Sequence, residues 1–132
     1  MTAGDALHAR IEAYLGHLAV ERRLSAHTVD GYRRDLLALA EWMRASGLVR
    51  FADLGTEPLR GFIAGEHRRG LSAKSLQRRL SALRSFFADL LRRGELTANP
   101  AQALRAPKAP RKLPQVLDAD EMTRLIEADL AR

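Results

Sequence analysis

Apolar residues recur along most of this chain at intervals of three and four, which is the spacing of one face of an α-helix. The sequence has no alternating runs of β-branched residues, the usual sign of strands. Gly, Pro and Ser bound four predicted helices, which run from about residue 5 to 22, from after Ser25 to Gly47, from after Thr56 to before Gly70, and from after Ser72 to Gly94. A short fifth helix is predicted around residues 100–104, with Asn99 as its cap. The pattern therefore predicts an all-α fold.

The apolar positions of these helices predict the core and the way the helices pair. The predicted core residues are Leu7, Ile11, Tyr14, Leu15, Leu18, Val29, Tyr32, Leu36, Leu39, Ala40, Met43, Leu76, Leu80, Leu83, Phe87, Leu90 and Leu91. Segments 24–47 and 71–94 each begin with Leu-Ser-Ala and end in Gly. This short internal repeat predicts two helical hairpins that pack across each other. Shared capping residues without common ancestry are the alternative explanation, and they predict a similar geometry.

The composition changes after residue 105. Three prolines and three basic residues then alternate, namely Pro107, Pro110, Pro114, Lys108, Arg111 and Lys112. This composition favours an extended basic linker over residues 106–117. Asp118 or Asp120 caps a further predicted helix, whose apolar residues have little to pack on before Arg132. We therefore expect one helical domain over residues 1–105 and, over 118–132, the start of a second domain that is cut short.

Basic charge is concentrated in the middle of the chain. Residues 1–59 contain seven Lys/Arg and eight Asp/Glu, residues 60–112 contain thirteen and three, and residues 113–132 contain two and five. A concentrated block of positive charge is typical of a protein that binds a polyanion, and nucleic acid is the first candidate. Helices whose basic faces are only solvated are the alternative.

The sequence offers little for catalysis. It has no Cys, and its four His do not fall at metal-ligand spacing, so we expect neither a thiol nucleophile nor a metal or other cofactor. Tyr14 and Tyr32 lie at core positions of amphipathic helices, where packing is the usual role of a tyrosine. No apolar run is long enough to cross a bilayer and the N-terminus does not resemble a secretory signal, so we expect a cytoplasmic protein without a small-molecule substrate.

The fourth predicted helix carries the best candidates for DNA binding. Lys74, Arg78, Ser81 and Ser85 fall on one face, opposite the apolar stripe, and Arg79 and Arg84 flank that face within reach of phosphates. The alternative is an ordinary solvated surface.

The starts of the second and fourth helices add further candidates. Ser25 and Ser72 are predicted N-caps, and each is followed three residues later by a hydroxyl residue, Thr28 or Ser75, where a capping box would have Glu or Gln. The first-turn N–H groups are then free to receive a phosphate.

Three stretches of the sequence resemble a known family. These are LSxxTxxxYxxDL at 24–36, LSALRSFFxxLLRRGELTANPA at 80–101 and APKAPRKLP at 106–114. Together they resemble the N-terminal core-binding, SAM-like domain of tyrosine recombinases of the phage integrase family, and the XerC group more than the XerD group. The resemblance implies a four- or five-helix domain that closes around duplex DNA together with a C-terminal catalytic domain.

The resemblance also implies which residues bind DNA and what the whole protein does. It places the second and fourth helices over the major groove. The full set of expected DNA-binding residues is Ser25, His27, Thr28, Arg33, Ser72, Lys74, Ser75, Arg78, Arg79, Arg84, Lys108, Arg111 and Lys112. Arg78 would pair with a guanine or with a phosphate. The family's catalytic Arg, Lys, His and Tyr residues belong to the C-terminal domain and match nothing here, so the resemblance implies a non-enzymatic part of a recombinase. With a XerD-like partner in a heterotetramer, that enzyme would resolve chromosome dimers at cell division.

Two other functions fit parts of the pattern. One is a helical protein-interaction module that presents its basic face to an acidic protein, and the other is the N-terminal domain of a phage or transposon integrase. A stand-alone helix-turn-helix regulator is disfavoured, because the linker and the last predicted helix would serve no purpose in it.

The linker generates a prediction of its own. Replacing Lys108 or Lys112 with alanine should weaken binding to all duplexes alike, because a flexible lysine neutralises phosphates without recognising bases. Each replacement should lower the slope of log affinity against log salt concentration by about 1. Titration of several unrelated duplexes at two salt concentrations measures both effects, and a loss confined to one duplex would contradict the prediction.

Overall fold

The computed structural model describes residues 3–106, which form four α-helices and one short 3₁₀-helix. The elements are α1 (Ala3–Arg22), α2 (Ala26–Ala45), η1 (Phe51–Asp53), α3 (Thr56–Arg68) and α4 (Ala73–Arg92). This range contains no strand, so the predicted all-α class is confirmed. The predicted linker beyond residue 106 and the helix predicted after residue 118 lie outside the described residues.

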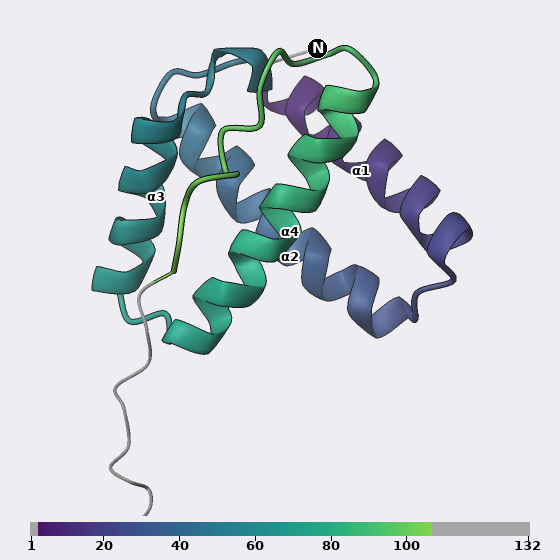
Figure 1. The fold of residues 1–132 in the computed structure, drawn as a ribbon, viewed down its shortest axis with the longest axis horizontal. Helices are drawn as coiled ribbons and strands as arrows, with labels where there is room; N and C mark the ends of the chain where they lie inside the picture. Colours follow the sequence, from purple (N-terminus) through teal and green to yellow (C-terminus); the bar gives the residue numbers. More distant parts are fainter. Residues whose placement is uncertain (1–2, 107–132) are drawn as a thin grey trace, which may run out of the picture.

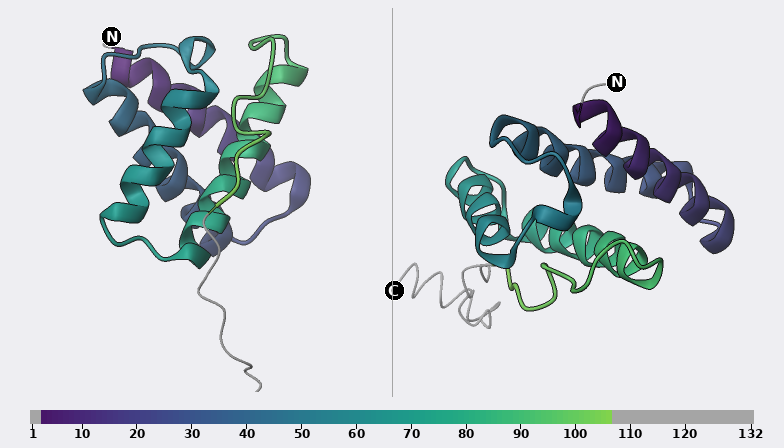
Figure 2. Two further views of the ribbon diagram at one scale, coloured as in Figure 1. Left: turned by 60° about the vertical axis from the view of Figure 1, so that its left-hand side comes forward. Right: turned by 90° about the horizontal axis from the view of Figure 1, so that it is seen from above.

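The helices pair into two hairpins that cross each other. α1 and α2 run antiparallel, α3 and α4 run antiparallel, and α4 passes over α2 in contact with both α2 and α3 (Figures 1 and 2). The starts of α2 and α4 lie along the lower edge of Figure 1, and the described chain ends near the start of α4. This arrangement agrees with the pair of hairpins predicted from the repeat.

The two halves of the repeat begin and end alike. The Ser25 hydroxyl accepts a hydrogen bond from the Thr28 amide at 3.1 Å, and the Ser72 hydroxyl accepts one from the Ser75 amide at 3.1 Å. After each helix comes a glycine with a positive φ, +81° at Gly47 and +78° at Gly94, which lets the chain turn at little conformational cost. The predicted helix boundaries are therefore close to the observed ones.

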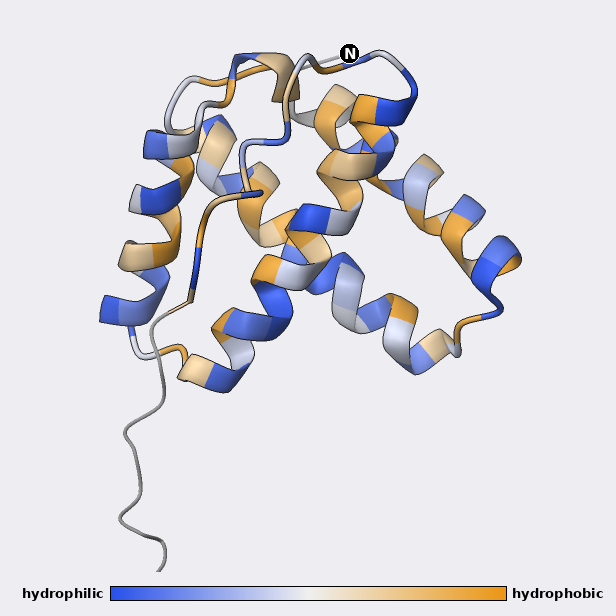
Figure 3. Ribbon diagram, in the orientation of Figure 1, coloured by the Kyte–Doolittle hydropathy of each residue, from blue (hydrophilic) through white to orange (hydrophobic). Residues whose placement is uncertain are grey.

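The core is built around α4. Its buried apolar residues belong to one core cluster with those of α1, α2 and α3. Hydrophobic and hydrophilic residues recur in turn along α3 and α4 (Figure 3). Phe86 has no exposed surface, and its ring centroid lies 4.9 Å from that of Phe51 and 5.2 Å from that of Tyr14. Phe86 was missing from the predicted core because α4 is covered from several sides and buries a wider arc than one stripe. Leu91 lies just beyond that arc and is 39% exposed, so its predicted burial is wrong.

The predicted fifth helix does not form. Residues 99–104 make two successive turns, with the Gln102 amide donating to the Asn99 carbonyl and the Leu104 amide to the Ala101 carbonyl. Asn99 still acts as a cap, since its side chain accepts from the Ala101 amide at 3.0 Å. Few residues are left for a helix before Pro107, which disfavours helical backbone at the residue preceding it. Burial of Ala101 and Leu104 holds the segment against the domain instead.

A buried carboxylate ties the C-terminal half of α4 to α1. Asp89 is 4% exposed, and it accepts hydrogen bonds from Arg93 at 2.9 Å, Arg92 at 3.1 Å and Arg10 of α1 at 3.4 Å. Burial alone would raise the pKa of Asp89, but the hydrogen bond from Arg93 and the charges of the three arginines outweigh it and hold the pKa below its ordinary value of 3.8. The ionised form of Asp89 therefore stabilises the folded state.

The lowered pKa of Asp89 predicts how stability depends on pH. Its contribution should be complete above about pH 4, the pKa of an unfolded aspartate, and should be lost as the pH falls through the lower folded-state pKa. Asp89→Asn should reduce the free energy of unfolding near pH 7 by about 1–3 kcal/mol. The variant should also vary less with pH below about 4 than the parent.

Urea denaturation between about pH 3 and pH 7 measures both effects. Asp53→Asn is the matched control, because Asp53 makes an exposed pair with Arg50 and should contribute little. Equal losses in the two variants would contradict the role of Asp89.

Candidate nucleic-acid interface

The starts of α2 and α4 form one edge of the domain. We call this edge the helix-start surface and define it by Ser25, His27, Thr28, Ser72, Lys74 and Ser75. Neither helix has an acidic residue in its first turn. The amide groups at both starts and the positive ends of both helix dipoles therefore lie on the same side of the molecule (Figure 1). Such an edge favours an anion.

Hydroxyl groups line this surface. The Ser25 hydroxyl caps α2 and donates to the Thr28 hydroxyl at 3.0 Å, and His27 beside it is exposed. Ser72 caps α4 in the same manner, with Ser75 half-buried three residues later. Each cap uses only one of the amides that a helix start leaves without a partner, so the others can bind an incoming acceptor.

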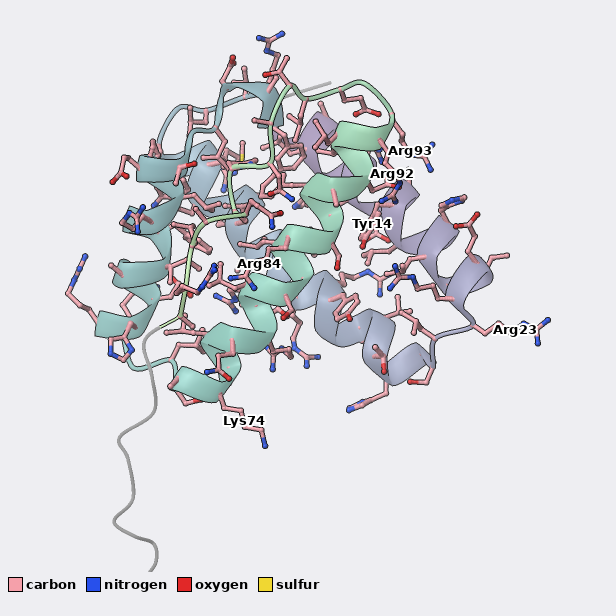
Figure 4. The ribbon with its side chains drawn as sticks, in the orientation of Figure 1. Tyr14, Arg23, Lys74, Arg84, Arg92 and Arg93 are labelled. Carbon is pink, nitrogen blue, oxygen red and sulfur yellow. The ribbon has the colours of Figure 1, made fainter. Side chains whose placement is uncertain are left out.

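Lys74 supplies the positive charge of the helix-start surface. Its exposed side chain points away from the domain at the start of α4 (Figure 4). No carboxylate between residues 3 and 106 forms an ion pair with it. Lys74 can therefore give its full charge to a ligand.

Arg78 lies one turn further along α4, but it has a partner. Its Nε donates to Oδ2 of Asp35 at 2.9 Å and its Nη2 to Oδ1 of the same carboxylate at 2.7 Å. This pair raises the pKa of Arg78 through the hydrogen bonds from its guanidinium. The side chain remains 44% exposed, on the face of α4 that also carries Lys74 and Ser81. Arg78 is therefore accessible to a ligand although its charge is balanced.

Arg79 lies inside the domain. It is 8% exposed, and its guanidinium donates to Asp35 at 3.1 Å and to Glu66 of α3 at 2.6 Å. The sequence predicted that it flanks the DNA-facing side and reaches phosphates, and the structure gives it a different position. Arg79 follows Leu76 by three residues and precedes Leu83 by four, so its spacing already placed it on the core face.

Arg33 and Arg84 also have partners within the domain. Arg33 of α2 donates to both carboxylate oxygens of Glu12 in α1, at 2.8 and 3.0 Å, and to Asp30 at 2.7 Å. Arg84 lies between α4 and the segment after it, where it donates to the carbonyls of Ala101 and Leu104 (Figure 4). Both arginines hold parts of the domain together. Lys108, Arg111 and Lys112 lie outside the described residues.

Sequence reasoning missed Asp35 and Glu66, the two acids that organise these arginines. Asp35 has no exposed surface and accepts three hydrogen bonds from two arginines. Its spacing carried a signal, because it follows Tyr32 by three residues and precedes Leu39 by four. An acid on a core face must have a buried partner, and Arg79 on the core face of α4 was the matching candidate.

Two hollows border α4 in the described part of the domain. A groove of about 560 Å³ between α4 and the segment that follows it is lined by Gln77, Leu80, Ser81, Arg84, Arg105 and Ala106, without a nucleophile beside a base. Tyr14 borders a smaller hollow, but burial raises its pKa to about 12, which agrees with its predicted role in the core. Within residues 3–106 no three His or acidic side chains are placed to hold a metal ion.

The sequence from residue 11 to residue 94 matches the family model described as phage integrase, N-terminal SAM-like domain. The matched region runs from the middle of α1 through the end of α4 and therefore contains both hairpins. The chain belongs to this family. The predicted resemblance to the SAM-like domain of phage integrases is thereby confirmed.

Curated relatives of this SAM-like domain are tyrosine recombinases named XerC. The chain is 60% identical over 123 residues to the protein of Xanthomonas campestris pv. campestris strain B100, covering 93% of this chain and 38% of that protein. It is 52% identical over 117 residues to the Xylella fastidiosa strain 9a5c protein, covering 89% and 40%, and 47% identical over 121 residues to the Pseudomonas aeruginosa strain LESB58 protein, covering 92% and 40%. The predicted similarity to the XerC group is confirmed.

The similarity to XerC proteins covers only part of their length and extends to no solved structure. The chain spans about two fifths of the length of the XerC proteins it matches. No solved structure matches it. Over residues 3–106, no helix of this SAM-like domain combines the length and apolar character that crossing a membrane requires.

The position of Arg79 predicts that it contributes to stability and not directly to binding. Arg79→Met should lower the free energy of unfolding by about 3–5 kcal/mol, because it leaves the buried Asp35 with one fewer partner and Glu66 with none from α4. Lys74→Met is the control on the same helix and should change stability by less than about 0.5 kcal/mol. Urea denaturation of both variants measures the difference, and a stable Arg79 variant that binds DNA poorly would contradict the structural role.

Proposed function

We propose that this chain is the DNA-binding part of a XerC-type tyrosine recombinase, and that it binds duplex DNA through the helix-start surface. The observation that carries the proposal is the geometry of this surface. Two helices begin on one edge without first-turn acids, and Lys74 extends from that edge without an acidic partner in the described domain. The family match and the XerC relatives support the same function.

The chemistry of the helix-start surface suits a duplex. An α-helix fits the major groove of B-DNA, and the free amides at two helix starts suit the phosphates on either side of it. Thr28 and Ser75 add hydroxyl donors, His27 adds an exposed ring, and Lys74 adds a charge that releases counterions from the DNA. Ser25 and Ser72 act mainly by capping the helices, so that the remaining amides keep their direction.

The described residues end near the start of α4 (Figure 1). Basic residues 108, 111 and 112 follow within a few residues of that point in the sequence. We therefore keep Lys108, Arg111 and Lys112 among the proposed phosphate contacts. Arg33 and Arg84 take a secondary part in this proposal and Arg79 only an indirect one, since their partners within the domain use much of their hydrogen-bonding capacity.

The proposed whole protein is a recombinase in which this domain binds and a C-terminal domain performs the strand exchange. In that scheme residues 1–105 form the binding domain, residues 106–117 the linker and residues 118–132 the start of the catalytic domain. The partner would be a XerD-like recombinase in a heterotetramer, and the reaction would resolve chromosome dimers in the cytoplasm without a cofactor. The coverage of the XerC relatives by this chain supports that arrangement.

Salt-dependent duplex binding tests the proposal. The chain should retard duplex DNA at about 50 mM salt, and affinity should fall by orders of magnitude at about 200 mM because several phosphate contacts release counterions. Lys74→Ala should weaken binding to every duplex and lower the slope of log affinity against log salt concentration by about 1.

Arg44→Ala provides the matched control. Arg44 lies in the last turn of α2, about 27 Å from the start of that helix at 1.5 Å per residue, and pairs with Glu41. Its removal should change affinity much less than the removal of Lys74. Equal effects of the two substitutions would show that only overall charge matters, and absence of binding at about 50 mM salt would refute the proposed function.

A further inference from the structure

Arg78 uses one edge of its guanidinium for Asp35 and leaves the other edge without a partner in the described domain. Asp35 accepts from Nε and Nη2 of Arg78, which form one edge of the planar group. Arginine has five N–H donors, so both hydrogens of Nη1 and the second hydrogen of Nη2 remain. These donors form the other edge, and the side chain is 44% exposed. Two parallel donors match the O6 and N7 acceptors that guanine presents in the major groove.

The pair is held in place from behind. Asp35 has no exposed surface, and its Oδ1 also accepts from Nε of Arg79 at 3.1 Å. Arg79 is itself held by Glu66 of α3 at 2.6 Å. Arg78 therefore has its guanidinium fixed by a buried carboxylate on α2 that is anchored to α3. A surface arginine normally loses rotamer freedom when it binds, and here that loss has occurred on folding.

The charge of Arg78 is balanced, which separates its role from that of Lys74. Asp35 pairs with Arg78 and Arg79, and Glu66 pairs with Arg79 and the exposed Arg69, so the charge of Arg78 is offset by the carboxylate of Asp35. Arg78 therefore adds little net charge to the surface, while its donors keep their direction. Lys74, four residues earlier on the same face of α4, has charge without a fixed direction. Directional hydrogen bonds give sequence preference, and unpaired charge gives general affinity.

We propose that Arg78 is a specificity-determining residue that recognises a guanine with the outer edge of its guanidinium, and that the buried Asp35 is the residue that positions it. The proposal rests on the proposed function, since it names what Arg78, one turn along α4 from Lys74 of the helix-start surface, does in DNA binding. It assigns Lys74 to the phosphates and Arg78 to a base.

The test selects duplexes from a library with a randomised core by binding to the 132-residue chain, followed by sequencing. The parent chain should enrich guanine at a defined position. Arg78→Gln should lower the guanine preference there by about tenfold, the discrimination typical of a bidentate base contact. The lost charge affects all duplexes alike and cancels from this ratio.

Lys74→Gln is the matched control, because it removes one charge from the same helix face. It should weaken all duplexes and leave the guanine preference intact. An unchanged guanine preference in Arg78→Gln would overturn the proposal and indicate a phosphate contact. Binding without any guanine preference in the parent chain would also overturn it while leaving the proposed function standing, whereas no duplex binding at all would refute the proposed function itself.

Asp35→Asn tests the positioning role. A freed Arg78 should keep or raise affinity for unrelated duplexes and lose the guanine preference, whereas a merely structural defect would weaken all binding. Side-chain NMR of the parent chain provides a test that does not depend on this variant folding. The Arg78 Nε–H group should have an order parameter near the backbone value of about 0.85, and a value below about 0.6 would overturn the positioning by Asp35.

Discussion

The domain depends on a buried carboxylate that belongs to one hairpin and is neutralised by the other. Asp35 lies on α2 with no exposed surface, and Arg78 and Arg79 of α4 reach it across the crossing between the hairpins. A carboxylate buried without partners would be strongly destabilising, so the two hairpins are stable only in an arrangement that brings α4 to α2 at this point. Apolar packing tolerates small shifts of one helix along another, whereas three hydrogen bonds to one carboxylate tolerate far less. Glu66 extends the same constraint to α3.

This constraint acts where the starts of α2 and α4 share an edge. Asp35 is in the third turn of α2, and Arg78 and Arg79 are in the second turn of α4. The relative position of the two helix starts, and therefore of their unpaired amides, follows from these ion pairs more directly than from the aromatic cluster around Phe86. Asp89 performs the corresponding task at the other end of α4, where it fixes α1. Each end of the central helix is thus joined to the first hairpin by a buried acid and its arginines.

Local features of the sequence predicted the fold. The features that the sequence did not predict depend on contacts between elements that are distant in the sequence. The serine caps, the glycines after the helices and the helical periodicity act within a few residues, so the four helices and the repeat followed from them. The turns at 99–104, the burial of Phe86 and the exposure of Leu91 depend on which elements cover α4, and periodicity alone does not contain that information. In the candidate site, spacing placed Lys74 and Arg78 on one exposed face, as the structure does. Spacing did not distinguish the exposed Lys74 and Arg78 from Arg79 and Arg84. The hydrogen-bond partners of Arg79 and Arg84 lie on other elements.

The ion pairs within the domain also reduce the positive charge that the middle of the chain can offer to a ligand. The block from residue 60 to residue 112 contains thirteen basic and three acidic residues, and this excess first indicated a polyanion partner. Within the described domain, however, Asp35 and Glu57, which precede the block in the sequence, pair with arginines that belong to it. Asp89, which lies inside the block, pairs with two further arginines of the block. The count along the sequence therefore overstates the charge available to a ligand. Many of these arginines serve the fold, because a guanidinium can join several acceptors on different helices at once. Lysine forms such bridges less well, which is consistent with Lys74 being the residue of the helix-start surface that presents its charge outward.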